Sequence, residues 1–489
     1  MNLLPDELTP SMRNLFSSLK VLLKITLLLF LFWLPVLNSF GQFGAIDPDF
    51  SNVAAPNDEV SGMALQPDGK ILISGNFTKC GTTTRNRIAR LNSDGILDSG
   101  FDPGTGLSNN ATQILVLQDG KILLAGNFGL VQGTGVLKLA RLFANGLLDT
   151  SFHSGSTGIG NVLCVAQQPD GKILVGGSFT NFNGVSQTSI TRVLLNGRRD
   201  TSFHSGAGAP GTVESITLEP DGKILIAGDF LTYNGVARTR VARLLSSGVL
   251  DVGFDPGTGA SNYIMSSKRQ PDGAYILAGE FSTFNNLNRK RIVRLFSNGT
   301  VDPGFDPGTG ANNVITCSSI LPDGKTLVGG LFVSFNGSLV KYLTCLNPDG
   351  SLVQSFNAGG PGLSSQVLEI LVQPDGKILV GGLFTSYNGI SRNRILRILG
   401  QSTTELEELF ARKPTSLFPN PAFSQTSIQN TEATTANYII RDLPGKPIAF
   451  GKILSGESQI LEVKNWTKGI YTVEIQTSGK RRMDRLVIN

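Results

Sequence analysis

The chain has 489 residues, with 42 Lys and Arg against 37 Asp and Glu, which gives a formal net charge of +5. Both signs are mixed through the repeats, so the basic stripe that a nucleic-acid-binding protein needs is missing and nucleic acid is excluded as a partner. The four cysteines include no Cys-x-x-Cys pair, and we expect free, partly buried thiols and neither a metal nor a cofactor site.

The N-terminal 41 residues have the features of a signal peptide. Arg13, Lys20 and Lys24 precede an apolar run at residues 25–37, and small residues at Ser39 and Gly41 suit a cleavage site before residue 42. The run is shorter than the roughly 20 residues that span a bilayer, which argues against a retained membrane anchor. The sequence therefore predicts an exported chain whose contact with membranes comes only from export or later attachment.

Two phrases repeat through residues 42–400. An Asp-Gly turn recurs seven times, and a phrase of the form G-x-L-D-x-x-F, with substitutions, recurs every 51 residues. Their last residues are, respectively, Gly69, Gly120, Gly171, Gly222, Gly273, Gly324 and Gly376, and Phe50, Phe101, Phe152, Phe203, Phe254, Phe305 and Phe356. Self-similarity at about 50 residues is typical of a propeller or a solenoid.

Each unit reads as four antiparallel strands. In the first unit, residues 60–66 and 70–77 are rich in β-branched and apolar residues and flank a Pro-Asp-Gly turn, which predicts a hairpin of strands A and B. Residues 87–92 and 96–101 flank a second turn and predict strands C and D. Four such strands form one blade, so we predict an all-β, seven-bladed β-propeller.

The two ends of the repeat region complement each other. The first copy of the G-x-L-D-x-x-F phrase, residues 44–50, precedes any strand A, and the last unit stops at Gly400 after its strand C. We therefore expect the N-terminal strand to close the ring, which would leave no exposed sheet edge there. An Arg and an Asp that should face each other across the C/D turn recur in blades one to five, and by this pattern Arg397 should pair with Asp47.

Residues 401–412 form an acidic linker, and residues 413–489 have the pattern of a small C-terminal β-sandwich. A Phe-Pro-Asn-Pro segment begins at Phe418, a turn follows at residues 442–445, Tyr471 lies in a later strand and Arg485 opens the last one. This order resembles the C-terminal sorting domain (Por) of type IX secretion cargo. The resemblance implies contact of residues 413–489 with the type IX machinery, and a place outside or on the outer surface of a Bacteroidetes-type cell.

The repeats resemble delta-60 repeat proteins. The phrases LQPDGKILISGNF and NRIARLNSDGILD carry this likeness, and they are also similar to the NHL-type propellers in their turn and strand C phrases. The delta-60 family implies a propeller in an exported protein, and it implies no particular biochemical activity.

The loops between strands B and C, and between one blade and the next, should share one face of the ring, where we expect a ligand. The candidate binding residues there are basic side chains and the only two histidines, namely Arg85, Arg238, Arg240, Arg289, Lys290, Arg392, His153 and His204. They could receive acidic glycans, although solvated loops and turn-capping residues would look the same. Aromatic residues of the same loops could stack on sugars or pack beneath the turns.

Glu369 is the only acid that the pattern places at its level in the central channel. That level is seven residues before the A/B glycine, where Cys164 and Cys317 also lie. No second carboxylate is expected beside it, and no catalytic motif appears elsewhere. We therefore expect a non-enzymatic scaffold that binds glycan or protein, and the alternative is a polysaccharide hydrolase or lyase that uses Glu369 and other carboxylates at the channel mouth.

Overall fold

The computed structural model describes residues 42–153, 160–357 and 360–401 and, near the C-terminus, 415–418, 425–430, 435–442, 446–455, 457–467, 469–477 and 480–488. The chain divides into two compact units, Met1–Gly400 and Gln401–Asn489. Every regular element in the described residues is a strand, so none of these residues forms a helix able to cross a membrane. The predicted signal peptide, residues 1–41, and nearly all of the predicted linker lie outside the described residues.

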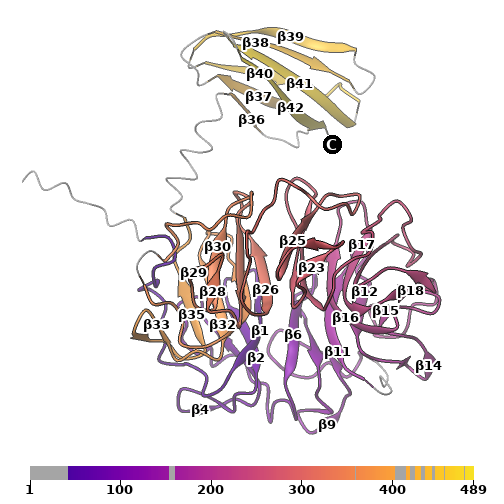
Figure 1. Cartoon of the computed structure of the whole chain (residues 1–489), viewed down its shortest axis with the longest axis vertical. Coiled ribbons are helices and arrows are strands. Elements are labelled where there is room, and N and C mark those ends of the chain that lie inside the picture. Colours follow the sequence, from indigo (N-terminus) through magenta and orange to yellow (C-terminus); the bar gives the residue numbers. More distant parts are fainter. Residues whose placement is uncertain are drawn as a thin grey trace, which may run out of the picture. The chain divides into compact units, whose positions relative to one another are not determined.

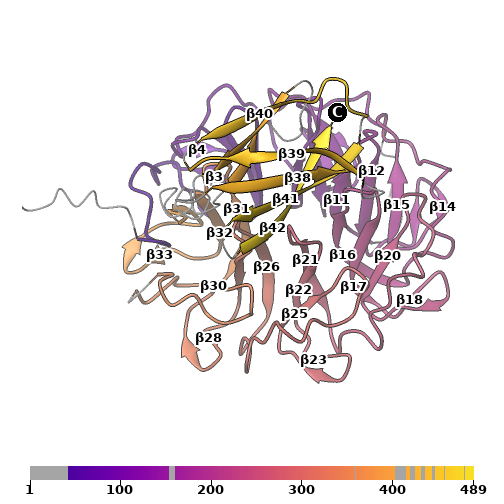
Figure 2. The same cartoon turned by 90° about the horizontal axis from the view of Figure 1, so that it is seen from above.

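The first unit consists of seven three-stranded antiparallel sheets, the blades, which surround a central axis (Figures 1 and 2). The innermost strands, A, are β1 (Val60–Leu65), β6 (Ala111–Val116), β11 (Val162–Gln167), β16 (Gly211–Leu218), β21 (Ile264–Arg269), β26 (Ile315–Ile320) and β31 (Val367–Val372). The middle strands, B, are β2 (Ile71–Gly75), β7 (Ile122–Gly126), β12 (Ile173–Gly177), β17 (Ile224–Phe230), β22 (Tyr275–Gly279), β27 (Thr326–Gly330) and β32 (Ile378–Gly382). The outer strands, C, are β5 (Ile88–Leu91), β10 (Leu139–Leu142), β15 (Ile190–Val193), β20 (Val241–Leu244), β25 (Ile292–Leu295), β30 (Leu343–Leu346) and β35 (Ile395–Ile398).

The middle strand of each blade is buried on both of its faces because neighbouring blades pack against it. In β2 all five residues are buried, and the same holds for β7, β12, β22, β27 and β32. This two-sided burial explains why strand B is a continuous apolar run instead of an alternating one.

The prediction of a full strand D in each blade is wrong, because the structure has only a single bridge there. In the first blade only Leu97 pairs with strand C, through a bridge to Leu91, and the chain then turns. The turn forms because Asp98 accepts a hydrogen bond from the backbone N–H of Gly100 at 2.9 Å, which draws the chain away from the sheet edge. Phe101 is fully buried after this turn. Each blade therefore has three strands and a single bridge where a fourth strand was expected.

The B/C loop of every blade contains a small two-stranded hairpin. These hairpins are β3–β4 (Lys79–Cys80, Thr83–Thr84), β8–β9 (Leu130–Val131, Thr134–Gly135), β13–β14 (Asn181–Phe182, Val185–Ser186), β18–β19 (Thr232–Tyr233, Val236–Ala237), β23–β24 (Thr283–Phe284, Leu287–Asn288), β28–β29 (Ser334–Phe335, Ser338–Leu339) and β33–β34 (Ser386–Tyr387, Ile390–Ser391). Bridges such as Leu107 to Val131 join the loop that leaves one blade to the hairpin of the next. The two kinds of loop therefore lie side by side, as predicted.

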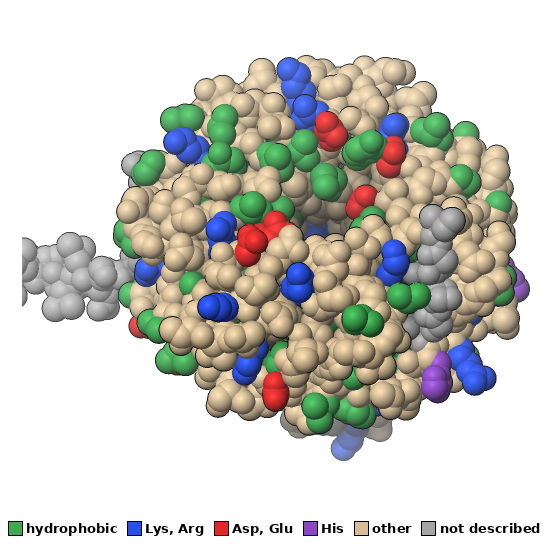
Figure 3. All heavy atoms as spheres, turned by 90° about the horizontal axis from the view of Figure 1, so that it is seen from below, with side chains coloured by type: hydrophobic (Ala, Val, Ile, Leu, Met, Phe, Trp, Pro, Cys, Tyr) green, Lys and Arg blue, Asp and Glu red, His purple; other side chains and the backbone are tan. Residues whose placement is uncertain are grey.

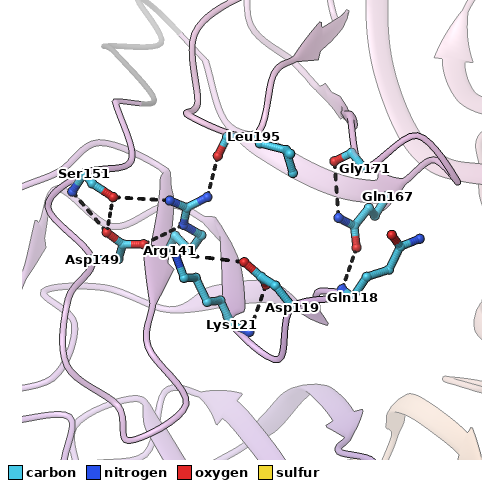
Figure 4. Close-up of polar contacts among 9 residues, drawn as sticks. All are labelled: Gln118, Asp119, Lys121, Arg141, Asp149, Ser151, Gln167, Gly171 and Leu195. Carbon is cyan, nitrogen blue, oxygen red and sulfur yellow. Dashed lines mark hydrogen bonds and ion pairs between the residues drawn. The ribbon is translucent and has the colours of Figure 1, made fainter.

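An arginine in strand C ties neighbouring blades together. In Figure 4, Arg141 donates through Nε to Asp149 at 2.8 Å and through Nη1 to the carbonyl of Leu195 in the next blade. Lys121 Nζ lies 3.0 Å from the same Asp149 carboxylate. The guanidinium carbon also lies 4.7 Å from the centre of the Phe152 ring, within the range of a cation–π interaction.

The same bond to the next blade recurs around the ring. It joins Arg90 to Ala144, Arg141 to Leu195, Arg192 to Ser246, Arg243 to Ser297, and Arg397 to Ser93. Among the described residues, Arg294 of blade five makes no such bond, and blade six has Cys345 and Val353 where the Arg and Asp would be. Two junctions, five to six and six to seven, therefore lack this link.

The N-terminal segment pairs with the last blade, and we call this contact the N-terminal clasp. Ile46 forms an antiparallel bridge with Ile398, and Arg397 donates through Nε to Asp47 Oδ2 at 2.6 Å, which confirms the predicted pair. Lys377 Nζ lies 2.9 Å from the same carboxylate, and Asp47 is 1% exposed. Backbone hydrogen bonds from Gly44 to Leu399, from Asp47 to Arg397 and from Leu399 to Ala45 accompany the bridge and the buried ion pair. The clasp is therefore a short pairing at this edge and is less than the full strand that the sequence predicts.

The second unit contains two antiparallel sheets. One is formed by β36 (Thr415–Phe418), β37 (Gln425–Asn430) and β40 (Ser458–Glu462), and the other by β39 (Pro447–Ile453), β38 (Ala436–Arg441), β41 (Gly469–Thr477) and β42 (Lys480–Ile488). Ile428 and Leu461 of the first sheet share one core with Ile440, Val473 and Leu486 of the second. This shared apolar layer holds the two sheets face to face.

We expect Asp47→Ala to destabilise the propeller by about 3–5 kcal/mol, because it leaves the buried guanidinium of Arg397 and the partly exposed ammonium group of Lys377 without their carboxylate. Urea denaturation followed by far-ultraviolet circular dichroism would measure the change. Asp49→Ala is the matched control, since Asp49 is exposed and only its backbone contacts Asp47. Equal stability of the two variants would show that the clasp does not hold the ring.

We also expect the propeller to lose stability in acid. Burial disfavours ionisation of Asp98, but bonds from Gly100, Lys70 and Arg90 outweigh it and lower its pKa to about 2. The pKa values of Asp47, Asp149 and Asp200 are lowered in the same way. Because these folded-state values lie below the unfolded value of 3.8, their contribution is complete above that pH and is lost as the pH falls from about 4 toward 2. Unfolding free energies that stay constant over this range would contradict the prediction.

Candidate functional site

The central channel contains a cavity of about 220 Å³ that is lined by residues of all seven strands A. The space-filling view in Figure 3 shows a hollow at the centre of one face of the ring, with acidic and basic side chains around it. Apolar and uncharged polar residues line the cavity on every side. All three charged residues come from blades four to seven, and we call this side the polar half of the channel.

A one-residue irregularity in each strand A decides which side chains reach this cavity. In β16, Val213 pairs with Gly228 but Ser215 pairs with Ala227, so Glu214 is an extra residue without a partner. Gly228 permits this close approach, because a Cβ there would lie 2.0 Å from the carbonyl oxygen of Thr212. A β-bulge of this kind redirects a side chain, and Glu214 therefore lines the cavity together with its neighbour Ser215.

Hydroxyl groups join the inner strands of blades four, five and six. Ser215 Oγ lies 2.9 Å from Ser267 Oγ, and Thr217 Oγ1 lies 2.8 Å from the same Ser267 oxygen. Ser266 and Ser318 are joined in the same way at 2.8 Å. Ser266 and Ser267 are each at most 5% exposed. These bonds hold the polar half of the channel rigidly, because each buried hydroxyl has its partner on a neighbouring strand.

Three charged residues line the cavity, namely Glu214, Lys268 and Glu369. They come from β16, β21 and β31, and their side chains make no hydrogen bond or ion pair within the part of the chain that the structure describes. Burial inside the ring raises the pKa of Glu369 to about 7, and the positive charge of Lys268 partly opposes this shift. Burial, together with the charge of Asp229, also raises the pKa of Glu214.

Cys164 and Cys317 also line the cavity, at the level where the sequence places them. Both are buried and free, as are Cys80 and Cys345. Burial raises the pKa of the Cys317 thiol far above its usual range, and the nearby charge of Glu369 adds to the shift. The thiols are therefore protonated at neutral pH, which leaves them poor nucleophiles and poor metal ligands. No cluster of three or more His, Cys, Asp or Glu residues suited to a metal occurs among the described residues.

The predicted loop arginines do not gather at one place. Arg85, Arg238, Arg289 and Arg392 occupy the same position in blades one, four, five and seven, and each donates through Nη1 to the carbonyl of the residue before it. Arg240 Nε lies 3.3 Å from Asp229, and its Nη1 donates to the Ala260 carbonyl at 2.8 Å. Lys290 is exposed. The structure thus separates these side chains among four blades and away from the channel cavity.

His153 and His204 are exposed, and their backbone N–H groups donate to Asn196 and Ser247 in the turn of the next blade. Figure 3 shows histidine side chains at the outer rim and none at the central hollow. At the equivalent position of other blades, Asp102 and Asp255 cap a turn by accepting from the N–H two residues later. The residue after the repeated phenylalanine therefore caps a turn in these two blades.

The loop aromatics pack beneath their turns. Phe182, Tyr233, Phe284, Phe335 and Tyr387 are each at most 1% exposed, so none offers a ring face to a sugar. Tyr387 instead donates to the Gly44 carbonyl at 2.6 Å, which adds a side-chain contact to the N-terminal clasp.

Two family matches cover most of the chain. Seven segments, residues 66–101, 117–152, 168–203, 219–254, 270–305, 321–356 and 373–403, match the family described as Domain of unknown function (DUF5122) beta-propeller. Residues 416–489 match the Secretion system C-terminal sorting domain. These matches confirm the predicted seven-bladed all-β propeller and the Por-type tail, and they mark the chain as type IX secretion cargo. None of the curated proteins matches the chain.

Solved structures resemble the chain at low identity. A putative gluconolactonase is 13% identical over 72% of this chain and 91% of its own, with a TM-score of 0.31. Puromycin hydrolase is 13% identical over 80% of this chain, with a TM-score of 0.45, and the match spans 61% of that enzyme. A protein of unknown function from Bacteroides thetaiotaomicron is 12% identical over 59% of this chain and 72% of its own, with a TM-score of 0.34. At these values the likenesses carry no argument about activity.

We expect Lys268→Met to raise the pKa of Glu369 further, because it removes the only positive charge that favours the carboxylate. Carbon-13 NMR of glutamate-labelled protein would follow the titration. Since the folded-state pKa of Glu369 exceeds its usual 4.5, stability should fall between pH 4.5 and about 7 and then stay level. Glu369→Gln should remove this slope, and an unchanged slope would show that Glu369 is not the titrating group.

Proposed function

Because the chain belongs to the DUF5122 beta-propeller family and ends in a secretion sorting domain, we propose that it is an exported, non-enzymatic binding protein. Its ligand is an end group of a glycan or of a protein that enters the polar half of the channel. The signal peptide at residues 1–41 would start export, and the sorting domain would complete it, either into the medium or onto the cell surface.

The observation that carries this proposal is that the channel contains three charged side chains without a charged partner. Elsewhere in the propeller, buried carboxylates such as Asp98 and Asp149 are satisfied by Arg and Lys partners. Glu214, Lys268 and Glu369 break the repeat pattern and have no such partners among the described residues, although they line a cavity. Glu214 and Glu369 are half-buried and Lys268 is exposed on the channel wall. Carboxylates that are partly desolvated without a partner destabilise a fold, so the presence of Glu214 and Glu369 favours a role in binding.

The shape of the site favours binding over turnover of a polymer. The cavity of about 220 Å³ is smaller than the 300–1,000 Å³ typical of pockets that enclose a whole ligand, which suits an end group better than an internal segment of a chain. Ser215, Ser266 and Ser318 of the hydroxyl network line the cavity, where their remaining acceptor lone pairs can receive sugar hydroxyls or peptide N–H groups. The exposed Lys290 and the histidines would then contact only a large ligand that extends over the loop face.

A hydrolase or lyase is the second candidate, because the channel contains two carboxylates with raised pKa values. Glycoside hydrolysis uses one protonated and one ionised carboxyl group on either side of the scissile bond. Glu369, with its pKa near 7, would be the acid, and Glu214 would be the second carboxylate. These two residues come from blades four and seven, so they lie on strands that are not neighbours in the ring.

The test is a titration of the purified protein with a panel of glycans and surface proteins, followed by mass spectrometry of the mixture after prolonged incubation. We expect saturable binding without product, and Glu369→Gln and Glu214→Gln should each weaken it by about tenfold or more, the usual effect of removing one charged hydrogen-bond partner. Glu280→Gln is the control, because Glu280 does not line the cavity.

Three results would change the assignment. Products that accumulate with the native protein and vanish with Glu369→Gln would establish the enzyme. Binding that survives both channel substitutions would move the site away from the channel. An absence of binding to every glycan and protein in the panel would reject the proposed end-group site.

A further inference from the structure

Two blades have a pocket at their outer edge that is separate from the channel. The blade 2 outer pocket, of about 410 Å³, is lined by Gly135, Val136 and Phe152 among others. The blade 6 outer pocket, of about 320 Å³, is lined by the corresponding residues Leu339, Val340 and Phe356. Both lie between the B/C hairpin and the segment that follows strand C.

The repeat supplies an internal comparison for these pockets. The position of Val136 is occupied around the ring by Arg85, Val136, Gln187, Arg238, Arg289, Val340 and Arg392. In all seven blades the backbone N–H of this residue donates to the carbonyl seven residues earlier, at 2.9–3.2 Å. The backbone at this position is therefore held by the same bond in every blade, and the two outer pockets described above lie in the two blades that have valine there.

The longer side chains show what fits this space. In blades one, four, five and seven the guanidinium donates to the carbonyl of the preceding residue, at 2.9–3.0 Å. Arg85 also donates to the Phe101 carbonyl at 3.5 Å, and in blade three Gln187 donates to the Ile190 carbonyl at 2.8 Å. The residues that correspond to the acceptors of Arg85, Gly135 and Phe152 in blade two, line the outer pocket.

We propose that the outer pockets of blades 2 and 6 each receive an arginine side chain from a partner polypeptide. The valine wall suits the methylene groups of the arginine, and the backbone carbonyls suit its guanidinium, as they do for the protein's own arginines. In blade two the Phe152 ring is covered by Arg141, as the equivalent Phe101 is covered by Arg90 in blade one, where Arg85 also fits. A guanidinium is more weakly hydrated than an ammonium group and donates in a planar fork, so arginine fits better than lysine. Exposed leucines at the pockets, Leu137 and Leu339, add apolar surface for the residues around the inserted arginine.

This inference is independent of the channel. It concerns residues of the outer edge, and it identifies one partner as a polypeptide whether the channel binds a glycan, a protein or nothing. Substitutions at Val136 and Val340 leave Glu214 and Glu369 unchanged, so the failure of one proposal does not affect the other.

The experiment is methyl NMR of the full protein with labelled valines, titrated with N-acetyl-arginine methylamide. The matched probe is the citrulline analogue, which has nearly the same shape and no charge. We expect saturable shifts of the Val136 and Val340 methyl signals with the arginine probe and much smaller shifts with the citrulline probe. Val340→Arg should leave the Val136 shift intact, and Val136→Arg should leave the Val340 shift intact.

A gain-of-site variant completes the test. Arg238→Val should open an equivalent pocket in blade four, and the methyl signals of the introduced valine should shift with the arginine probe. Thermal unfolding of each variant would confirm that the fold is retained. Equal shifts with both probes, shifts that persist when both valines are replaced by arginine, or no shifts at Val136 and Val340 at the highest soluble probe concentration would each overturn the proposal.

Discussion

The propeller depends on one interaction more than on any other, the arginine of strand C that bonds to its own blade and to the next. In blade three its Nε binds the Asp of its own turn, its Nη1 binds a carbonyl of the neighbouring blade, and its plane lies over the Phe that ends the repeated phrase. Strand, turn and phenylalanine are therefore joined at one guanidinium. This explains why Arg, Asp and Phe recur together in the sequence, and why Asp and Arg are both replaced in blade six.

The same interaction occurs where the ring closes, but there the arginine comes from the last blade and the aspartate from the N-terminal segment. Arg397 binds Asp47, Lys377 supports that carboxylate, and Tyr387 reaches Gly44. Removing one member of the buried Arg397–Asp47 pair would destabilise the fold strongly, because the other charge would stay desolvated without a partner. The two junctions beside blade six lack the arginine link. Apolar packing such as that of Leu343, Val367 and Ile370 holds that side of the ring together with hydrogen bonds between inner strands, namely Ser266 to Ser318 and Thr316 to the Val367 carbonyl.

Residues that repeat in most blades have structural roles, whereas the candidate functional residues differ from their equivalents in the other blades. The repeated arginines, the loop aromatics and the turn-capping aspartates all have structural partners. The candidate sites are at positions where one or two blades differ from the rest. Glu214, Lys268 and Glu369 place charge in a channel of mostly neutral residues, and Val136 and Val340 open space that longer side chains occupy in other blades. A departure from an internal repeat can thus indicate a site without any comparison to relatives.

The sequence by itself determined the seven units, the extent of strands A to C within two residues, the partner of Asp47 and the position of Glu369 in the channel. These features follow from local periodicity and turn chemistry, which a repeat displays seven times over. The tertiary structure alone decided that strand D shrinks to one bridge, that a one-residue irregularity turns Glu214 into the channel, and that the strand C arginines reach the next blade. The physical reason is that these features depend on contacts between neighbouring blades and on a backbone irregularity, and neither leaves a mark on the spacing of apolar residues within one unit.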